Sequence, residues 1–176
     1  MAINKMTLFC LAGLLAASQA VNAEDNLKFT GTILPPTCDV DAASAEQTVN
    51  LGEFTPRDFS TVGATTAATK FQIKLKDCGN GATGSKVWFS GTGDSDDPTL
   101  LALSDTGTGN TMATGIGVQI LNKDQQPVSI NNTDATVNPV QAGDNTLDFY
   151  LRYKSTKSAV TAGNATAVMY FDLTYQ

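Results

Sequence analysis

The sequence predicts an all-β fold, built as an antiparallel β-sandwich. Apolar and polar residues alternate over short stretches, while the 3.6-residue period of an amphipathic helix is nearly absent. Clusters of Gly, Asn, Asp and Pro separate these stretches, as turns separate strands. Of the 176 residues, 41% are hydrophobic and only 16% are charged, so the chain has enough apolar surface for one sandwich core.

The strands are expected where the alternation is strictest, and the turns where Gly, Asn, Asp and Pro gather. Trp88 is the lone tryptophan, and we expect it to pack in the core, with a ligand groove as the alternative. No internal repeat or linker divides the chain. The expected strands are 27–34, 48–51, 71–75, 86–90, 117–121, 146–153 and 166–175, and the expected turns are 79–81, 91–98, 122–127 and 142–145.

Residues 1–23 have the features of a secretory signal peptide. Lys5 supplies the positive start, the apolar stretch 6–17 follows, and small residues lead to a cleavage site after Ala23, with Ala20 as the alternative. The apolar stretch is shorter than the about 20 residues that span a bilayer. The mature protein is therefore expected to be exported and soluble outside the cytoplasm.

Cysteine usage agrees with export. Cys10 lies in the leader, so Cys38 and Cys78 remain in the mature chain. In an exported protein two cysteines most simply form one disulfide, which would stabilise the fold by roughly 4 kcal/mol in the chain-entropy model. Two unpaired buried thiols are the alternative, and a metal site from two cysteines without histidine is weaker still.

Charge and composition disfavour several functions. The formal net charge is -6, whereas binding to a phosphate backbone needs a basic face. The chain has no histidine, which removes the usual general base and the commonest metal ligand. We therefore expect neither an enzyme nor a cofactor, and no nucleic-acid partner.

Two local motifs have simpler explanations. The string at 79–84 matches the G-x-G-x-x-G pattern of dinucleotide sites, but a predicted strand follows it instead of the helix that such a site requires. Asp94, Asp96 and Asp97 would suit Ca²⁺, yet the glycine and bidentate glutamate of an EF-hand loop are absent. Both segments are predicted to be loops.

The two ends of the mature chain carry the most information. Near the start, one face of the predicted strand is formed by Leu27, Phe29, Gly31 and Ile33, ahead of Pro35-Pro36. At the other end, alternation continues through almost the last residue. Chain ends usually fray, so this segment is expected to be held in a sheet. Its apolar face consists of Ala165, Ala167, Met169, Phe171, Leu173 and Tyr175.

With these features in view, the mature chain resembles the subunits of type 1-like fimbriae that Gram-negative bacteria assemble by the chaperone–usher pathway. The resemblance rests on the alternating extension before Cys38, the run 71–78 ending in Cys78, and the runs 100–103 and 115–121. It rests also on the dipeptides Phe149-Tyr150 and Arg152-Tyr153, the penultimate aromatic Tyr175, and Gly163, fourteenth from the end.

The resemblance implies an incomplete immunoglobulin-like sandwich that lacks its last strand and is completed by donor-strand exchange. It implies a signal peptide at 1–23, a donor extension at 24–34 and a pilin domain at 35–176. The protein would be a shaft or adaptor subunit that passes through the periplasm to a cell-surface fimbria and supports adhesion.

Site residues and partners follow from the same resemblance. Leu27, Phe29, Gly31 and Ile33 would enter the groove of a neighbouring subunit, and Gly31 would stand where the two backbones approach closely. A periplasmic chaperone would first fill the groove, before the outer-membrane usher hands the subunit to its neighbour. The groove strand would include Gly163, Ala167, Met169, Phe171, Leu173 and Tyr175.

A secreted, monomeric carbohydrate-binding sandwich is the alternative function, with Trp88 and Tyr153 as stacking platforms. Such a module would have a complete sheet and would not need the N-terminal extension. The choice between a major and a minor subunit stays open, as do the chaperone, the usher and the host receptor.

Overall fold

The computed structural model describes residues 30–31, 37–107, 109–133, 135 and 137–176. The predicted leader and Leu27, Phe29 and Ile33 lie outside the described residues. Residues 37–176 belong to one compact unit, and the following description concerns that unit.

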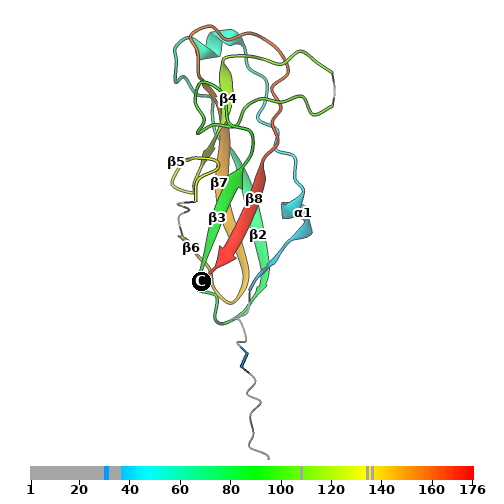
Figure 1. Cartoon of the computed structure of the whole chain (residues 1–176), viewed down its shortest axis with the longest axis vertical. Coiled ribbons are helices and arrows are strands. Elements are labelled where there is room, and N and C mark those ends of the chain that lie inside the picture. Colours follow the sequence, from blue (N-terminus) through cyan, green and yellow to red (C-terminus); the bar gives the residue numbers. More distant parts are fainter. Residues whose placement is uncertain (1–29, 32–36, 108, 134, 136) are drawn as a thin grey trace, which may run out of the picture. The chain divides into compact units, whose positions relative to one another are not determined.

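Two antiparallel sheets make up the described part of this unit (Figure 1). Sheet A has the strand order β1-β2-β7-β4-β5, and sheet B has the order β6-β3-β8. The short helices are α1 (Ala42–Ala45) and the 3-10 helix η1 (Pro56–Phe59). The strands are β1 (Asp39–Val40), β2 (Thr69–Cys78), β3 (Gly84–Ser90), β4 (Ile116–Leu121), β5 (Pro127–Val128), β6 (Val137–Pro139), β7 (Gly143–Ser155) and β8 (Tyr170–Tyr175).

The core lies between the sheets and is centred on three phenylalanines. The ring of Phe149 on β7 packs 5.7 Å from that of Phe71 on β2 and 4.9 Å from that of Phe89 on β3. These rings join the centre of sheet A to sheet B. The pair with Phe71 is stacked and the pair with Phe89 is edge-to-face, and both geometries add stability beyond the buried area. Alternate positions of each strand supply the rest of the core, as the period of two requires.

The predicted strands 71–75, 86–90, 117–121 and 146–153 are confirmed, since they lie within β2, β3, β4 and β7. The loop prediction for 79–84 is confirmed for 79–83 and is wrong at Gly84, where β3 begins. The prediction for 142–145 is wrong in part. β7 already starts at Gly143, where a glycine at φ 88° opens the strand.

The prediction of a strand at 48–51 is wrong. The edge of β2 that would pair with it is already occupied by side chains: the Lys74 N–H donates to Ser44 Oγ at 2.9 Å, and Gln47 Nε2 donates to the Gln72 carbonyl at 3.2 Å. Helix α1 therefore ends the β1–β2 ladder, and residues 48–51 form an irregular segment.

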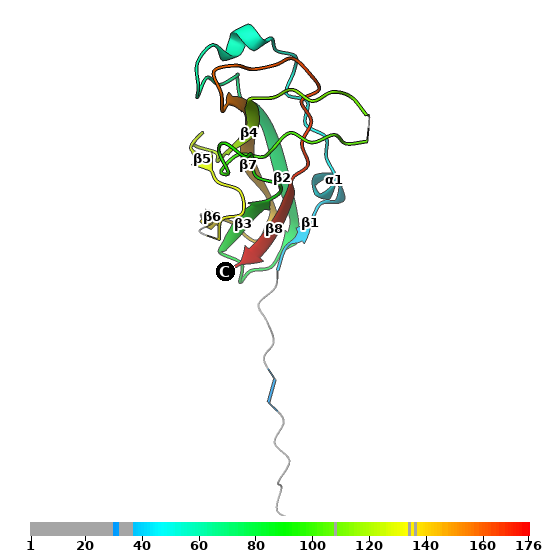
Figure 2. The ribbon, with the colours of Figure 1, turned by 45° about the horizontal axis from the view of Figure 1, so that its top comes forward.

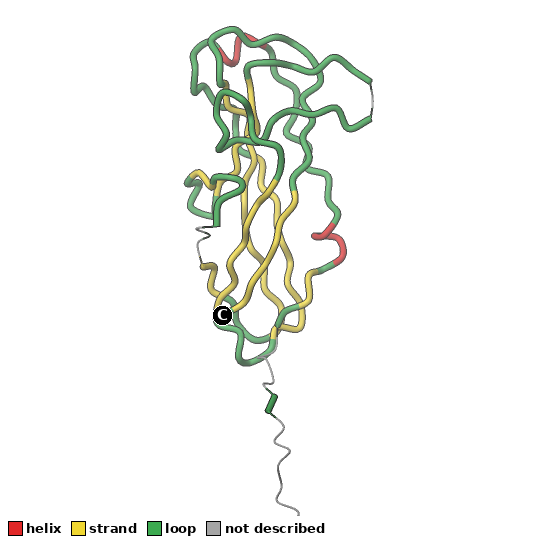
Figure 3. The backbone as a smooth tube through the Cα atoms, in the orientation of Figure 1, coloured by secondary structure: helices red, strands yellow, loops and turns green. Residues whose placement is uncertain are grey.

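The last predicted strand is shorter than expected. Of 166–175, only Tyr170–Tyr175 pairs with β3, because β3 ends at Ser90. Residues 166–169 are held differently: Thr166 accepts from the Ser104 N–H at 2.8 Å and its hydroxyl donates back to the Ser104 carbonyl at 2.7 Å. Figure 3 shows this segment as a loop that leads into β8.

The expectation that Trp88 lies in the core is also wrong. Inward positions of β3 are taken by Val87 and Phe89, so Trp88 points to the outer face, where it is half-buried. Its indole N–H donates to the Thr133 carbonyl at 2.9 Å. The residue therefore ties a loop to the outside of sheet B.

Candidate functional site

Strand β8 lies at the edge of sheet B and leaves its far side open. Gln176 and Gly84 exchange both main-chain hydrogen bonds, at 2.8 and 3.3 Å. Pairs in an antiparallel ladder alternate, so Phe171, Leu173 and Tyr175 fall in the non-hydrogen-bonded pairs with β3. Their main-chain N–H and C=O groups point away from β3, on the side where the described chain places no strand.

A groove of about 650 Å³ runs along this open side. One wall is the segment 165–169 with Phe171, and the facing wall is formed by residues 44–45 and 47–52. In Figure 2, β8 and β1 lie on the same side of the molecule, with α1 beside them. The floor comes mainly from sheet A, namely from Phe71, Val118, Leu151 and Tyr153, with Leu101.

The side chains of the β8 wall are apolar and only half-buried. Ala165, Ala167, Met169, Phe171 and Leu173 pack against the core while remaining partly exposed. An unpaired strand edge next to exposed apolar side chains is a template for the addition of another strand. The arrangement can therefore bind an extended apolar segment through its backbone and through alternate side chains together.

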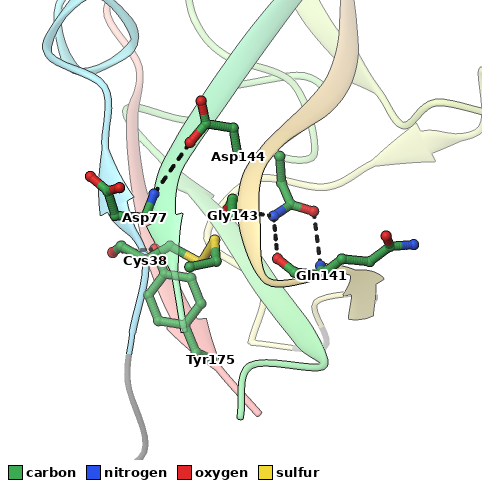
Figure 4. The surroundings of a disulfide bond; sticks show 8 residues. Cys38, Asp77, Gln141, Gly143, Asp144 and Tyr175 are labelled. Atoms are coloured by element: carbon green, nitrogen blue, oxygen red, sulfur yellow. Dashed lines mark hydrogen bonds between the residues drawn. A yellow bond between two sulfur atoms is a disulfide. The ribbon is translucent and has the colours of Figure 1, made fainter. Parts of the chain in front are cut away.

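Beyond the lining of the groove, at the end of β8 that is lowest in Figure 1, Tyr175 contacts Cys38. The Tyr175 hydroxyl donates to the Cys38 carbonyl at 3.1 Å, and burial followed by the nearby Asp39 charge raises the pKa of Tyr175. The predicted disulfide between Cys38 and Cys78 is present (Figure 4). It anchors the start of the domain to the end of β2, since β1 itself has only a short ladder with β2.

Gly163 lies outside β8, at the upper end of the groove. A Cβ there would lie 2.3 Å from the Ala113 nitrogen and 2.4 Å from the Met112 carbonyl carbon. Two main-chain bonds fix this contact, from Asn164 N–H to the Thr111 carbonyl at 2.8 Å and from Ala113 N–H to the Asn164 carbonyl at 2.9 Å. Glycine is therefore needed for close packing of two backbones.

A second depression of about 450 Å³, which we call the upper hollow, continues the groove beyond Ala165. Gly52, Tyr153 and Ala165 line both spaces. The Tyr153 hydroxyl donates to the Ala165 carbonyl at 2.6 Å, which fixes the boundary between them. The other residues of the upper hollow are 53–56, Phe59, Ala113, Ile116 and 160–164.

Sequence reasoning missed both the facing wall and the upper hollow. Residues 48–51 were expected to pair as a strand, but they form the wall at 44–52 instead. Phe54-Thr55-Pro56 was a possible signal for the upper hollow, because an aromatic next to a turn-forming proline is typical of an exposed loop rather than a strand.

The residues proposed for other functions are not brought together. Trp88 is on the outer face of sheet B, whereas Tyr153 is buried and points inward, so they share no stacking platform. Asp94 accepts from the N–H groups of Asp96 and Asp97, and those carboxylates pair with Lys157 and Lys154. Within the described ranges, no group of three or more acidic or cysteine side chains is placed to hold a metal ion.

The family model for "Fimbrial protein" matches residues 27–176. The chain belongs to this family. A fimbrial-like protein of Escherichia coli K12, YcbU, is 47% identical over 147 residues, which are 83% of this chain and 81% of YcbU. The fimbrial subunit type 1 of Salmonella typhimurium is 34% identical and aligns with 98% of this chain and 99% of its own length.

Solved structures agree with the fimbrial fold. The type I fimbria protein BPSL1626 of Burkholderia pseudomallei is 36% identical, with a TM-score of 0.58 over 84% of this chain and 94% of its own. The P pilus rod subunit PapA, at 24% identity, has the same fold, with a TM-score of 0.65 over 79% of this chain and 99% of its own. This fimbrial protein is therefore a structural subunit with the incomplete immunoglobulin-like fold of pilins. Helices long and apolar enough to cross a membrane do not occur in its described residues.

Proposed function

We propose that this fimbrial subunit polymerises by donor-strand exchange. Leu27, Phe29, Gly31 and Ile33 of one copy enter the groove of the next and pair with the open edge of β8. The observation that supports this proposal is the edge itself: Phe171, Leu173 and Tyr175 direct main-chain groups away from β3, to the open side, while their side chains stay half-buried. A donor strand would form hydrogen bonds with these main-chain groups and would bury these apolar side chains.

The domain's own ends favour antiparallel insertion. β8 runs toward Tyr175, and Tyr175 contacts Cys38, so the extension that precedes Cys38 must leave from the lower end. An antiparallel donor points its C-terminal end upward, and its own domain then stands beyond the upper end of the acceptor. A parallel donor would bring its domain to the lower end, where the acceptor's own extension leaves.

Head-to-tail contacts of this kind do not close on themselves, so they produce a filament. Each large apolar side chain of the donor that becomes buried contributes roughly 1.5–3 kcal/mol, and each new main-chain hydrogen bond contributes about 0.5–1.5 kcal/mol. Summed along the donor strand, these contributions are large enough for a joint between subunits that dissociates very slowly. The fibre would serve as a shaft or adaptor segment that supports adhesion at the cell surface.

Export completes the proposal. Residues 1–23 would direct the chain to the periplasm, 24–34 would be the donor extension and 35–176 the pilin domain. Until a neighbour arrives, a chaperone strand would cover the groove along Ala167, Met169, Phe171, Leu173 and Tyr175, above which Gly163 fixes the upper end. The outer-membrane usher would then exchange the chaperone for the next subunit.

The test compares two charged double variants in the exported chain, expressed with a fimbrial chaperone. Leu27→Asp with Phe29→Asp puts charges on the face that enters the groove, whereas Lys28→Asp with Thr30→Asp puts them on the opposite face. On unheated SDS gels, the wild type and the second variant should form ladders that collapse on boiling, and the first should not. Ladders from the first variant, or a wild type that stays monomeric without a chaperone, would refute the proposal and favour a complete sandwich such as a sugar-binding module.

A further inference from the structure

We propose that the outer face of sheet B binds a neutral, linear oligosaccharide. The site is a diagonal line of apolar side chains, which we call the outer stripe, formed by Val137 on β6, Trp88 on β3 and Tyr170 on β8. Trp88 shares no stacking platform with Tyr153, but it shares this face with Tyr170. The outer stripe faces away from the groove, so a donor strand added beside β8 would leave it exposed.

Strand pairing places the three side chains in one line. Residues directly opposite each other on neighbouring antiparallel strands point to the same face of a sheet. Val137 pairs with Lys86 and Tyr170 pairs with Ser90, which are two residues before and two residues after Trp88 on β3. Strands β3 and β8 lie side by side in Figure 1. Diagonal neighbours are about 7–8 Å apart, so the outer stripe is about 15 Å long.

The outer stripe is accessible to solvent. Tyr170 is 67% exposed and Val137 is 43% exposed, although both side chains are large and apolar. Trp88 is half-buried, and the bond from its indole N–H to the Thr133 carbonyl holds the ring in place. A ring that is held in this way loses little conformational freedom when a ligand stacks on it.

Polar side chains border the outer stripe on both sides. Lys86 and Asp172 are diagonal neighbours on one side, and Ser90 lies on the other. Elsewhere on the described surface lysines pair with aspartates, as Lys154 does with Asp97. The side chains of Lys86 and Asp172 have no hydrogen bond or ion pair with the described residues. Their donors and acceptors are therefore available to a ligand.

A sugar ring matches both parts of this surface. One face of a pyranose carries C–H groups that stack on an aromatic ring, while its hydroxyl groups donate and accept hydrogen bonds at the edge. The charges of Lys86 and Asp172 are opposite and cancel locally, and the chain has a net charge of -6, which disfavours an anionic glycan. A neutral oligosaccharide is therefore the ligand that fits.

The size of the face argues against a second protein as the occupant. Sheet B has three strands, and β8 has six residues. With strands about 4.8 Å apart and a rise of about 3.4 Å per residue, the whole face measures roughly 300 Å². A stable protein interface buries about 800 Å² on each partner. The face is large enough for a short oligosaccharide, and repetition of the site along a fibre would raise the avidity.

Intrinsic fluorescence reports on this site directly, because Trp88 is the single tryptophan of the sequence. The first experiment titrates the purified, exported protein with neutral tetrasaccharides, namely cellotetraose, mannotetraose, maltotetraose and chitotetraose, and with sialyllactose as an anionic probe. At least one neutral tetrasaccharide should change the emission of Trp88 saturably, and sialyllactose should not. No saturable change with any neutral probe, or an equal response to sialyllactose, would overturn the proposal.

Tyr170→Ala should weaken the binding of that tetrasaccharide about tenfold, because one of two stacking rings is lost while Trp88 still reports binding. Asp172→Ala should weaken it several-fold through the loss of an acceptor. Tyr150→Ala is the matched control and should bind like the wild type, since Tyr150 lies on the outer face of sheet A. Urea midpoints separate loss of the site from loss of folding. Equal binding by Tyr170→Ala and Tyr150→Ala in folded protein would refute the role of the outer stripe.

The outcomes also separate this site from the joint between subunits. Normal SDS-resistant ladders without sugar binding would overturn the sugar site and leave donor-strand exchange intact, whereas sugar binding by a chain that forms no ladders would do the reverse.

Acrylamide quenching tests another copy of the chain as the occupant. The emission of Trp88 should be equally accessible in fibres and in the unassembled Leu27→Asp, Phe29→Asp variant. Protection of Trp88 in fibres alone would mean that a neighbouring subunit covers the outer stripe, which would count against the sugar site.

Discussion

The two long sides of the sandwich end in edges of different kinds. On one side the edge strands are β5 and β6, which are short and contain Pro127 and Pro139. Short edge strands with proline cannot easily accept a further strand. On the other side, the edge of sheet B is β8, whose residues Tyr170–Tyr175 contain no proline.

The two sides of the sandwich also differ in how far loops cover them. Near β5 and β6 the sandwich is covered. Ile130, in the loop after Val128, and Val140, which follows β6, are buried, and the loop is tied to Trp88 by the bond from its indole N–H to the Thr133 carbonyl. Beside β8, half-buried apolar side chains line an open groove. The comparison teaches that strand addition is blocked on one side and left available on the other, so the open edge is a feature of one side and not a general property of this fold.

The largest effect is expected from a charge in the groove. Phe171→Asp should abolish SDS-resistant ladders, because an unpaired carboxylate would face the apolar floor and the donor. The neighbouring Tyr170→Asp is the matched control, since Tyr170 is 67% exposed and faces away from the groove. Gel analysis of unheated fibres compares the two. Equal behaviour of both variants would mean that the groove face of β8 is not the joint.

Gly163→Ala should destabilise the domain by about 1–3 kcal/mol, the usual cost of forcing extra atoms into packed structure. The new Cβ would collide with the backbone at Met112 and Ala113, which cannot move aside like a flexible side chain. Urea unfolding measures the loss, with the adjacent and exposed Ala162→Ser as control. An unchanged midpoint would show that the upper end of the open side tolerates rearrangement.

Tyr175→Phe should lower the stability of the domain by about 0.5–1.5 kcal/mol, because the Cys38 carbonyl loses the hydroxyl that donates to it. Tyr170→Phe removes a hydroxyl from an exposed ring on the same strand and should change the unfolding free energy little. Chemical denaturation of both variants makes the comparison. If the two losses were equal, the hydrogen bond between Tyr175 and Cys38 would have no energetic role.

The smallest effect is expected from acid. Hydrogen bonds from Lys76 and the Ala43 N–H lower the pKa of Asp41, and those from Lys70 and Gln72 lower the pKa of Asp148 below the ordinary value of 3.8. A lowered pKa in the folded state means stability that is present above about pH 4 and lost as pH falls further. Urea midpoints between about pH 2 and 6 should therefore decline at the acid end.

Replacing both carboxylates, with Asp41→Asn and Asp148→Asn, should flatten that decline. Both side chains are partly exposed and their ion pairs are open to solvent screening, so the slope and not the absolute stability is the sensitive quantity. A double variant with the same slope as the wild type would assign the acid sensitivity to other carboxylates.

Strong periodicity made the central strands predictable. In β2, β3, β4 and β7, apolar and polar residues alternate regularly, and each of these strands lies between two neighbouring strands. The segment 48–51 alternates too, but α1 and its side chains had already satisfied the edge of β2. Local pattern shows which face is apolar, whereas the partner of an edge is decided by segments distant in the sequence.

Gly163 and Trp88 illustrate the same limit. The glycine was singled out by its position near the C-terminus, but its physical role came from a backbone contact with Met112 and Ala113 that no spacing reveals. Trp88 was assigned to the core on residue type, although the alternation with Val87 and Phe89 gave it the opposite face.

The sequence by itself determined the all-β class, the pairing candidates Cys38 and Cys78, and the apolar alternation at both ends, because these depend on residue type and on a period of two. Only the tertiary structure decided which edges stay open. β5 and β6 close one side, β8 leaves the other unpaired, and Phe54 forms a hollow where the groove ends. Those features arise from contacts between distant segments, because the hydrogen-bonding partner of a strand lies in another part of the chain or in another molecule.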